Sequence, residues 1–199
     1  MKVLPELTEL GIDRTIPFDW GLPKLVEARF PKLRIMDLGR KSIGEAGALA
    51  LAEGIAKGHF DALARMALGG NPIPESAAVK ILQAMSTSNM QLDLVLDFND
   101  IPLGADFCEA LGSFWASPAA IKLCEYSLVN TGFGDAEAAI LAKALVPGVL
   151  PKLYFIEFGK NSQIGEEGKS ALNEAARVHR ESNVDHKGRP KCQSKILFS

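Results

Sequence analysis

The chain has 199 residues, with 22 basic and 24 acidic side chains and a formal net charge of −2. This length suits one domain or two very small ones, and 47% hydrophobic with 23% charged residues excludes a disordered polyelectrolyte. The near balance of charge also excludes a general nucleic-acid binder, which needs a dense basic face to neutralise phosphates.

The chain contains no segment that resembles a membrane span or a secretory signal. Its longest apolar runs, such as 48–52 and 138–142, are far shorter than the roughly 20 residues that cross a bilayer. Residues 1–10 carry Glu6 and Glu9 and have no apolar core. Three cysteines without a CxxC pair fit a reducing compartment. We therefore expect an intracellular, cytoplasmic protein that does not bind a membrane.

Residues 1–32 are expected to form an N-terminal cap. This segment is irregular and carries four prolines, and the only helix that its sequence suggests covers 23–29. Several apolar residues of the segment are expected to cover the open edge of the first repeat: Phe18, Trp20, Leu22, Leu25, Val26 and Phe30.

From Leu33 onwards the sequence repeats itself. Counting from Leu33, apolar residues fall at offsets 0, 3, 5, 10 and 18, and similar segments follow with starts at 63, 91, 123 and 153. The spacings are 30, 28, 32 and 30 residues, and five such copies in register are rarely produced by chance.

Each unit is interpreted as a short strand followed by a helix. Offsets 3 and 5 alternate, so both side chains point to one side of a strand, and the second half has helical periodicity. Asparagine at offset 8 can bond the turn after the strand and the neighbouring unit. The residues at this offset are Lys41, Asn71, Asn99, Thr131 and Asn161.

The pattern LxxLxLxxN, followed by I-G-x-x-G and a full helix, resembles the leucine-rich repeats of the ribonuclease-inhibitor-like type. The turn Thr131-Gly-Phe-Gly-Asp135 resembles theirs closely, and the resemblance covers about 33–176. It implies an α/β solenoid of about five repeats, with parallel strands on a concave face and helices on a convex face. It also implies interaction roles, such as inhibition, GTPase-activating scaffolding or innate sensing. Ribonuclease inhibitors are richer in Cys, so inhibition of a ribonuclease is not favoured. The acidic tail that is typical of Ran GTPase activators is missing, so that role is not favoured either.

The repeats are expected to occupy residues 33–181, and the last helix covers 165–181. Residues 182–199 form a polar, basic tail, because 185–199 carries four basic residues and one acidic residue. We interpret this tail as a solvated linker or a disordered segment. An alternative is a docking peptide for an acidic surface.

Motifs that would carry catalysis or bind a cofactor are missing. Gly165–Ser170 resembles the end of a phosphate-binding loop, but position 163 is Gln where that loop needs Gly. His59, His179 and His186 have no metal-ligand spacing and are expected at the surface. We therefore expect no enzyme activity, no cofactor and no metal.

The concave face is the expected binding surface, because strand residues between the core positions point outward there. Acidic residues surround apolar ones on this face, which is typical of a protein-binding patch that takes a partner with a basic surface. The candidate residues are Arg65, Asp93, Val95, Asp97, Phe98, Glu125, Val129, Phe155 and Glu157. The alternative is an unused, mildly acidic surface on which a loop buries Phe98.

The leading hypothesis is therefore a protein–protein interaction module. One alternative is a structural subunit that is fixed in a larger assembly. Another is an α/β enzyme, but enzymes with doubly wound sheets have strands buried on both faces. The strand around Leu94–Phe98 mixes apolar with charged residues instead.

Overall fold

The computed structural model describes residues 2–12, 17–90, 95–184 and 192–198. Its strands are β1 (Lys2–Val3), β2 (Glu9–Gly11), β3 (Ala28–Arg29), β4 (Ile35–Asp37), β5 (Arg65–Ala67), β6 (Val95–Asp97), β7 (Glu125–Ser127), β8 (Phe155–Glu157) and β9 (Lys195–Leu197). Its helices are α1 (Leu22–Leu25), α2 (Glu45–Ala56), α3 (Glu75–Thr87), α4 (Ala105–Trp115), the 3-10 helix η1 (Pro118–Ala120), α5 (Asp135–Ala144) and α6 (Glu166–Ser182).

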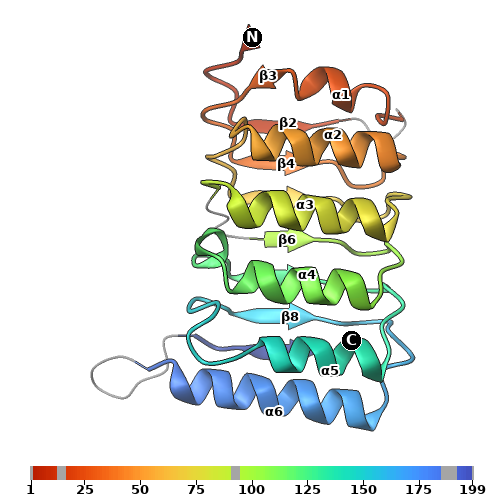
Figure 1. Cartoon of the computed structure of the whole chain (residues 1–199), viewed down its shortest axis with the longest axis vertical. Coiled ribbons are helices and arrows are strands. Elements are labelled where there is room, and N and C mark those ends of the chain that lie inside the picture. Colours follow the sequence, from red (N-terminus) through yellow and green to blue (C-terminus); the bar gives the residue numbers. More distant parts are fainter. Residues whose placement is uncertain (1, 13–16, 91–94, 185–191, 199) are drawn as a thin grey trace.

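Seven strands form one open, parallel sheet, and their order β2-β4-β5-β6-β7-β8-β9 follows the chain (Figure 1). From β4 to β8, each strand pairs with its neighbour at a separation of 30 residues, as Ile35 does with Arg65. The expected α/β architecture of parallel strands alternating with helices is therefore confirmed. Strands β1 and β3 form a separate two-stranded sheet near the N-terminus.

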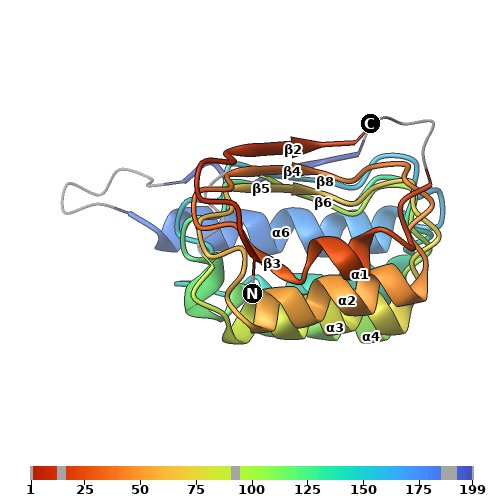
Figure 2. The ribbon, with the colours of Figure 1, turned by 90° about the horizontal axis from the view of Figure 1, so that it is seen from above.

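The helices α2, α3, α4 and α6 lie on one side of the sheet, and no described helix lies on the opposite, open side (Figure 2). α5 packs between α4 and α6. We call the open side the sheet face. It is the face on which the sequence places the candidate binding residues.

The core lies between the sheet and the helices. Two rows of inward strand residues and one row of helix residues are each at most 1% exposed. They are Met36, Met66, Leu96, Tyr126 and Ile156; Leu38, Leu68, Phe98, Leu128 and Phe158; and Leu51, Ile81, Leu111, Leu141 and Leu172. No single unit can bury both of its apolar surfaces, so stacking of the units creates the core.

The third unit starts at residue 93, so the expected start at 91 is wrong by two residues. Val95 pairs with Arg65, and Leu96 and Phe98 are the inward residues of β6. A two-residue slip leaves the same side chains on the same face of a strand, so alternation alone cannot detect it. With this correction, offset 8 of the third unit, which Asn71 occupies in the second unit, is held by Ile101 and not by Asn99.

Asn71 is buried and bonds the backbone of two neighbouring units, as its position predicts. Its Oδ1 accepts hydrogen bonds from the amides of Lys41 and Ile43, and its Nδ2 donates to the carbonyls of Leu38 and Leu68. Asn161 repeats the arrangement with the amides of Thr131 and Phe133 and the carbonyls of Leu128 and Phe158. Backbone groups that would otherwise be buried without partners are thereby satisfied.

The N-terminal cap differs in detail from the expectation. The expected helix over 23–29 is only α1, and β3 follows it. Leu22, Val26 and Phe30 are buried against the first repeat, whereas Trp20 is 75% exposed and does not cover it.

The C-terminal segment is only partly the solvated tail that the sequence suggests. β9 pairs in parallel with β8 and becomes the last strand of the sheet. Ile196 packs against the core, and the Phe198 ring stacks on Phe158 with centroids 6.1 Å apart. Alternating apolar residues thus cover the edge of β8. Residues 185–191, which hold most of the tail's charge, lie outside the described part of the chain.

Candidate protein-binding surface

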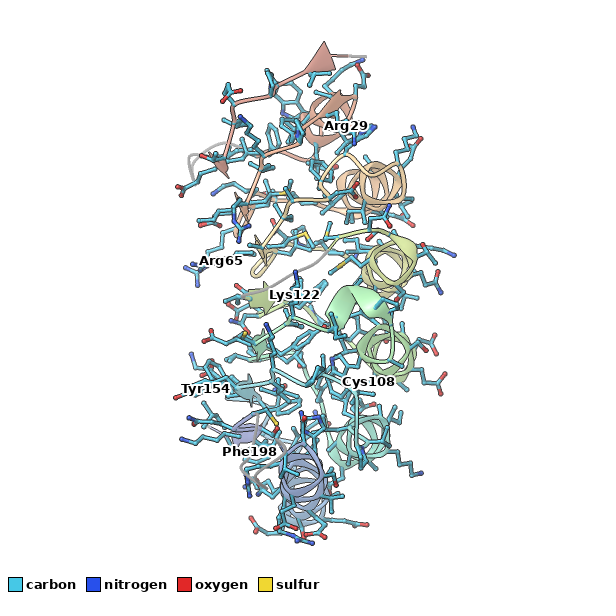
Figure 3. All side chains as sticks on the ribbon, turned by 90° about the vertical axis from the view of Figure 1, so that its left-hand side faces the viewer. Arg29, Arg65, Cys108, Lys122, Tyr154 and Phe198 are labelled. Carbon is cyan, nitrogen blue, oxygen red and sulfur yellow. The ribbon has the colours of Figure 1, made fainter. Side chains whose placement is uncertain are left out.

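Two rows of side chains cross the sheet face, because strand residues next to an inward residue point to the opposite side. Paired strand positions place them side by side. Row A contains Ile35, Arg65, Val95, Glu125 and Phe155, and row B contains Asp37, Ala67, Asp97, Ser127 and Glu157. Figure 3 shows Arg65 projecting on the side away from the helices.

Most of the expected site residues lie together on this face. Arg65 is exposed, and the following residues are half-buried: Val95, Asp97, Glu125, Val129, Phe155 and Glu157. Asp93 lies outside the described residues. Phe98 does not lie on the face: it is fully buried, and its ring meets Phe107 edge to face at 5.1 Å.

The error for Phe98 follows from the two-residue slip in the third unit. Asp100, not Phe98, occupies the turn position of Arg40 in the first unit. Both have positive φ, 57° at Arg40 and 56° at Asp100, as do Gly70, Asn130 and Lys160 at the same place in their units. A turn that repeats every 30 residues was thus a signal that could have placed Asp100 at the surface.

Arg40 reaches across a whole repeat to Asp100. Its guanidinium lies 3.8 Å from the Asp100 carboxylate, and a side chain at Gly70 would collide with the Arg40 stem at 2.6 Å. Asn130 donates a hydrogen bond to the other Asp100 oxygen at 2.9 Å. Because the Arg40–Asp100 pair is exposed, it orders the rim of the sheet face more than it stabilises the fold.

A hollow of about 290 Å³ opens in the middle of the sheet face. Its wall combines an aromatic ring, Phe155, and an aliphatic side chain, Val95, with the carboxylates of Asp97, Glu125 and Glu157. A second hollow of about 290 Å³ adjoins it and is lined by Asp37, Arg40, Arg65, Asp97 and Asp100, among others. Asp97 and Arg65 line both, so they lie at the centre of the surface.

Asp97 is held in a fixed position at this centre. Its Oδ1 accepts a hydrogen bond from the Asn99 amide at 2.8 Å, and Gly69 leaves it room, since a Cβ there would lie 2.9 Å from that oxygen. Burial raises the pKa of Asp97, while the Asn99 hydrogen bond and Arg65 oppose the rise and Asp37 and Asp100 add to it.

The surface combines negative charge with apolar anchors. The two rows and the turn positions contain five acidic residues, Asp37, Asp97, Asp100, Glu125 and Glu157, and three basic residues, Arg40, Arg65 and Lys160. Half-buried aromatic and aliphatic groups surrounded by carboxylates suit a partner that brings both apolar and cationic side chains.

The structure corrects the expectation that the histidines lie at the surface. His59 is 7% exposed and bonds the Val26 carbonyl at 2.7 Å, and His179 is fully buried. His186 lies outside the described residues. Within the described ranges, no three His, Cys, Asp or Glu side chains gather in a way that could hold a metal ion.

The segment that resembles the end of a phosphate-binding loop forms the start of α6. Asp135 of the preceding unit occupies this helix end, and its Oδ1 accepts hydrogen bonds from the amides of Gly165 and Gly168 at 2.8 and 2.9 Å. A carboxylate of the protein thus already sits where an anion would bind.

Among the described residues, none of the helices has the length and apolar character that a membrane crossing requires. A comparison of the sequence with protein-family models and with curated proteins finds no match in either set.

Proposed function

We propose that the chain is a leucine-rich-repeat solenoid of the ribonuclease-inhibitor-like type that binds a protein partner with a basic surface through the sheet face. One observation carries the proposal: acidic and apolar side chains from successive strands lie side by side, in register, on the face that none of the described helices covers.

The solenoid assignment is supported by the sequential strand order, the constant 30-residue register and the helices on one side. Doubly wound enzymes place helices on both faces of the sheet and bind ligands where the strand order reverses. The buried Asn71 and Asn161 serve the role that the repeat pattern assigns to them, since each bonds the backbone of the preceding unit.

The negative charge and the apolar side chains of the sheet face support a partner of this kind. A partner with Lys or Arg side chains would meet Asp97, Glu125 and Glu157, and its apolar groups would contact Val95 and Phe155. Charge complementarity of this kind sets association rate and specificity, and buried aromatic contacts supply most of the affinity.

The test is capture of a stoichiometric partner by the full chain, followed by titration of that partner with variants. Asp97→Lys and Phe155→Ala are each expected to weaken binding at least about tenfold, as hot-spot residues do. Glu109→Lys is the matched control, because it makes the same charge change on the exposed surface of α4.

Unchanged affinity in both sheet-face variants, with a loss for Glu109→Lys, would move the binding site to the helices. A partner without which the chain does not stay folded would instead favour a structural subunit. Size-exclusion chromatography with light scattering distinguishes these outcomes.

A further inference from the structure

A cluster of three side chains at the C-terminal end of the repeats has no part in the sheet face. His179 of α6, Cys192 and Ser194 are buried together. Ser194 Oγ lies 2.7 Å from His179 Nδ1 and 2.9 Å from Cys192 Sγ. Cys192 Sγ lies 3.7 Å from the same His179 nitrogen. A thiol, a hydroxyl and an imidazole thus form one hydrogen-bonded chain.

The direction of this chain follows from its far end. His179 Nε2 lies 2.6 Å from the Val149 carbonyl oxygen, which can only accept a hydrogen bond, so Nε2 carries the proton. In the neutral ring Nδ1 is then an acceptor, and Ser194 donates to it. The Ser194 oxygen is in turn free to accept from the Cys192 thiol. The hydrogen bonds thus run in one direction, from Cys192 through Ser194 to His179, as a proton relay requires.

The relay can move a proton away from the sulfur. When the Ser194 proton passes to His179 Nδ1, the Cys192 proton passes to Ser194, and a thiolate and an imidazolium result. Ser194 then donates back to the sulfur, and Asn183 Nδ2 donates to it at 3.4 Å. A deprotonated thiol is the nucleophile in thiol chemistry.

Cys192 is 7% exposed and lies at a surface hollow. It lines a hollow of about 710 Å³ together with Lys152, Tyr154, Arg180, Gln193 and Lys195, among others. The lining includes three cations and no carboxylate among the described residues, and Lys195 lies over the Tyr154 ring at 5.9 Å. A ligand that carries carboxylates would find counter-charges along the wall of this hollow.

The other two cysteines serve as comparisons within the same chain. Cys108 is fully buried in α4, and burial raises the pKa of its thiol far above the ordinary value. Cys124 is half-buried, and its thiol bonds the Lys122 carbonyl at 3.4 Å. Of the three thiols, that of Cys192 is joined to an imidazole by a chain of hydrogen bonds, and Cys192 lines a cationic hollow.

We propose that Cys192 is a thiol–disulfide exchange site for a small disulfide that carries carboxylates, with His179 as the base and Ser194 as the relay. This inference does not depend on the proposed function of the sheet face.

The exchange balances without a further reagent. The Cys192 sulfur attacks one sulfur of the small disulfide, a new S–S bond forms between them, and the S–S bond of the reagent breaks. The Cys192 sulfur is oxidised and the departing sulfur is reduced. The departing thiolate takes a proton from solvent, and His179 returns its proton to solvent, so one mixed disulfide and one free thiol result.

The experiment exposes the full, folded chain to glutathione disulfide at pH 7 and measures modification of each cysteine by peptide mass spectrometry after acid trapping. Cys192 is expected to react at least about tenfold faster than Cys124, and Cys108 is expected to stay unmodified. Ser194→Ala is expected to slow Cys192 about tenfold or more by removing the relay, while Cys124 keeps its rate.

A second variant tests the cationic hollow without touching the cluster. Lys152 is exposed, so Lys152→Gln leaves the fold intact. It is expected to slow the reaction of Cys192 with glutathione disulfide about twofold or more, and to leave its reaction with uncharged hydroxyethyl disulfide unchanged.

Either of two results would overturn the proposal. One is a Cys192 rate no greater than that of Cys124 in the unaltered chain. The other is an unchanged Cys192 rate in Ser194→Ala with a native circular-dichroism spectrum, which would leave the cluster a structural link between α6 and β9. If Ser194→Ala does not fold, the ratio of Cys192 to Cys124 and the Lys152→Gln comparison decide the question.

Discussion

The carboxylate of Glu75, the first residue of α3, accepts a hydrogen bond from the amide of Phe107 in the first turn of α4 at 2.9 Å. The same oxygen accepts from the Gly104 amide at 2.8 Å. Asp19 and Asp135 do the same for α2 and α6. The helices α2, α4 and α6 are therefore capped by a carboxylate of the preceding segment, which couples neighbouring units.

Glu75→Ala is expected to destabilise the protein by about 1–2 kcal/mol, since it removes a helix cap from two amides. Glu45→Ala is the matched control. Glu45 is also the first residue of its helix, but it is exposed, and the next helix follows Pro74, which has no amide hydrogen. Its loss is expected to cost less than about 0.5 kcal/mol. Urea unfolding of both variants measures the difference, and equal losses would contradict capping between units.

Asn71→Ala is expected to cost about 2–4 kcal/mol, because it leaves buried amides and carbonyls of two units without partners. Asn99→Ala is expected to cost less than about 1 kcal/mol, because Asn99 Oδ1 accepts only the Val129 amide among the bonds described for it. Thermal and urea unfolding compare the two. If Asn99→Ala destabilises the protein as much as Asn71→Ala does, the result would instead support a third unit that starts at residue 91.

Tyr126→Phe is expected to leave stability unchanged or to raise it by up to about 1 kcal/mol. The Tyr126 hydroxyl is buried, and among the described residues no partner makes a hydrogen bond of good geometry with it. Burial raises the pKa of this group well above its ordinary value, and the neighbouring Trp115 side chain opposes the rise. The ring itself packs edge to face on Trp115 at 5.8 Å. Tyr126→Ala is therefore expected to cost about 3–5 kcal/mol. A loss above about 1 kcal/mol for the Phe variant would show that the hydroxyl is bonded.

Asp97→Asn is expected to stabilise the protein at pH 7 and to have little effect below pH about 3.9, the ordinary pKa of Asp. Burial raises the folded-state pKa of Asp97, so folding favours its protonated form. The protonated Asp97 carboxyl therefore contributes to the free energy of unfolding in full below its pKa in the unfolded chain. This contribution is lost as the pH rises through its pKa in the folded protein. Unfolding in urea at pH 3.5 and pH 7 tests this.

Glu109→Gln on the exposed surface of α4 is the control for the loss of one negative charge. A destabilised Asn variant at pH 7 would contradict the raised pKa of Asp97. Residues that serve function are often kept at a cost in stability, and the expected gain from Asp97→Asn would be such a cost.

The repeat could be predicted from sequence because each unit carries its own signal. Alternating apolar residues mark the strand, helical periodicity marks the helix, and the asparagines at 71 and 161 mark the turn. The same logic placed Arg65, Val95, Asp97, Glu125, Phe155 and Glu157 on the sheet face. It failed at Phe98, because a strand shifted by two residues shows the same alternation.

The cluster at the C-terminal end could not be predicted in the same way. His179 lies on a helix that looks solvated from its charged neighbours, and Cys192 and Ser194 lie in a segment that looks like a polar tail. Their contact depends on β9 joining the edge of β8, which brings residues 13 and 15 positions apart to one point.

The sequence by itself determined the repeating strand-and-helix unit, the stacking of these units and the face that each strand turns outward, because these follow from local periodicity. Only the tertiary structure decided the capping of one helix by another segment and the burial of His179 beside Cys192. Those depend on pairing and packing between residues that are distant along the chain, which no local pattern encodes.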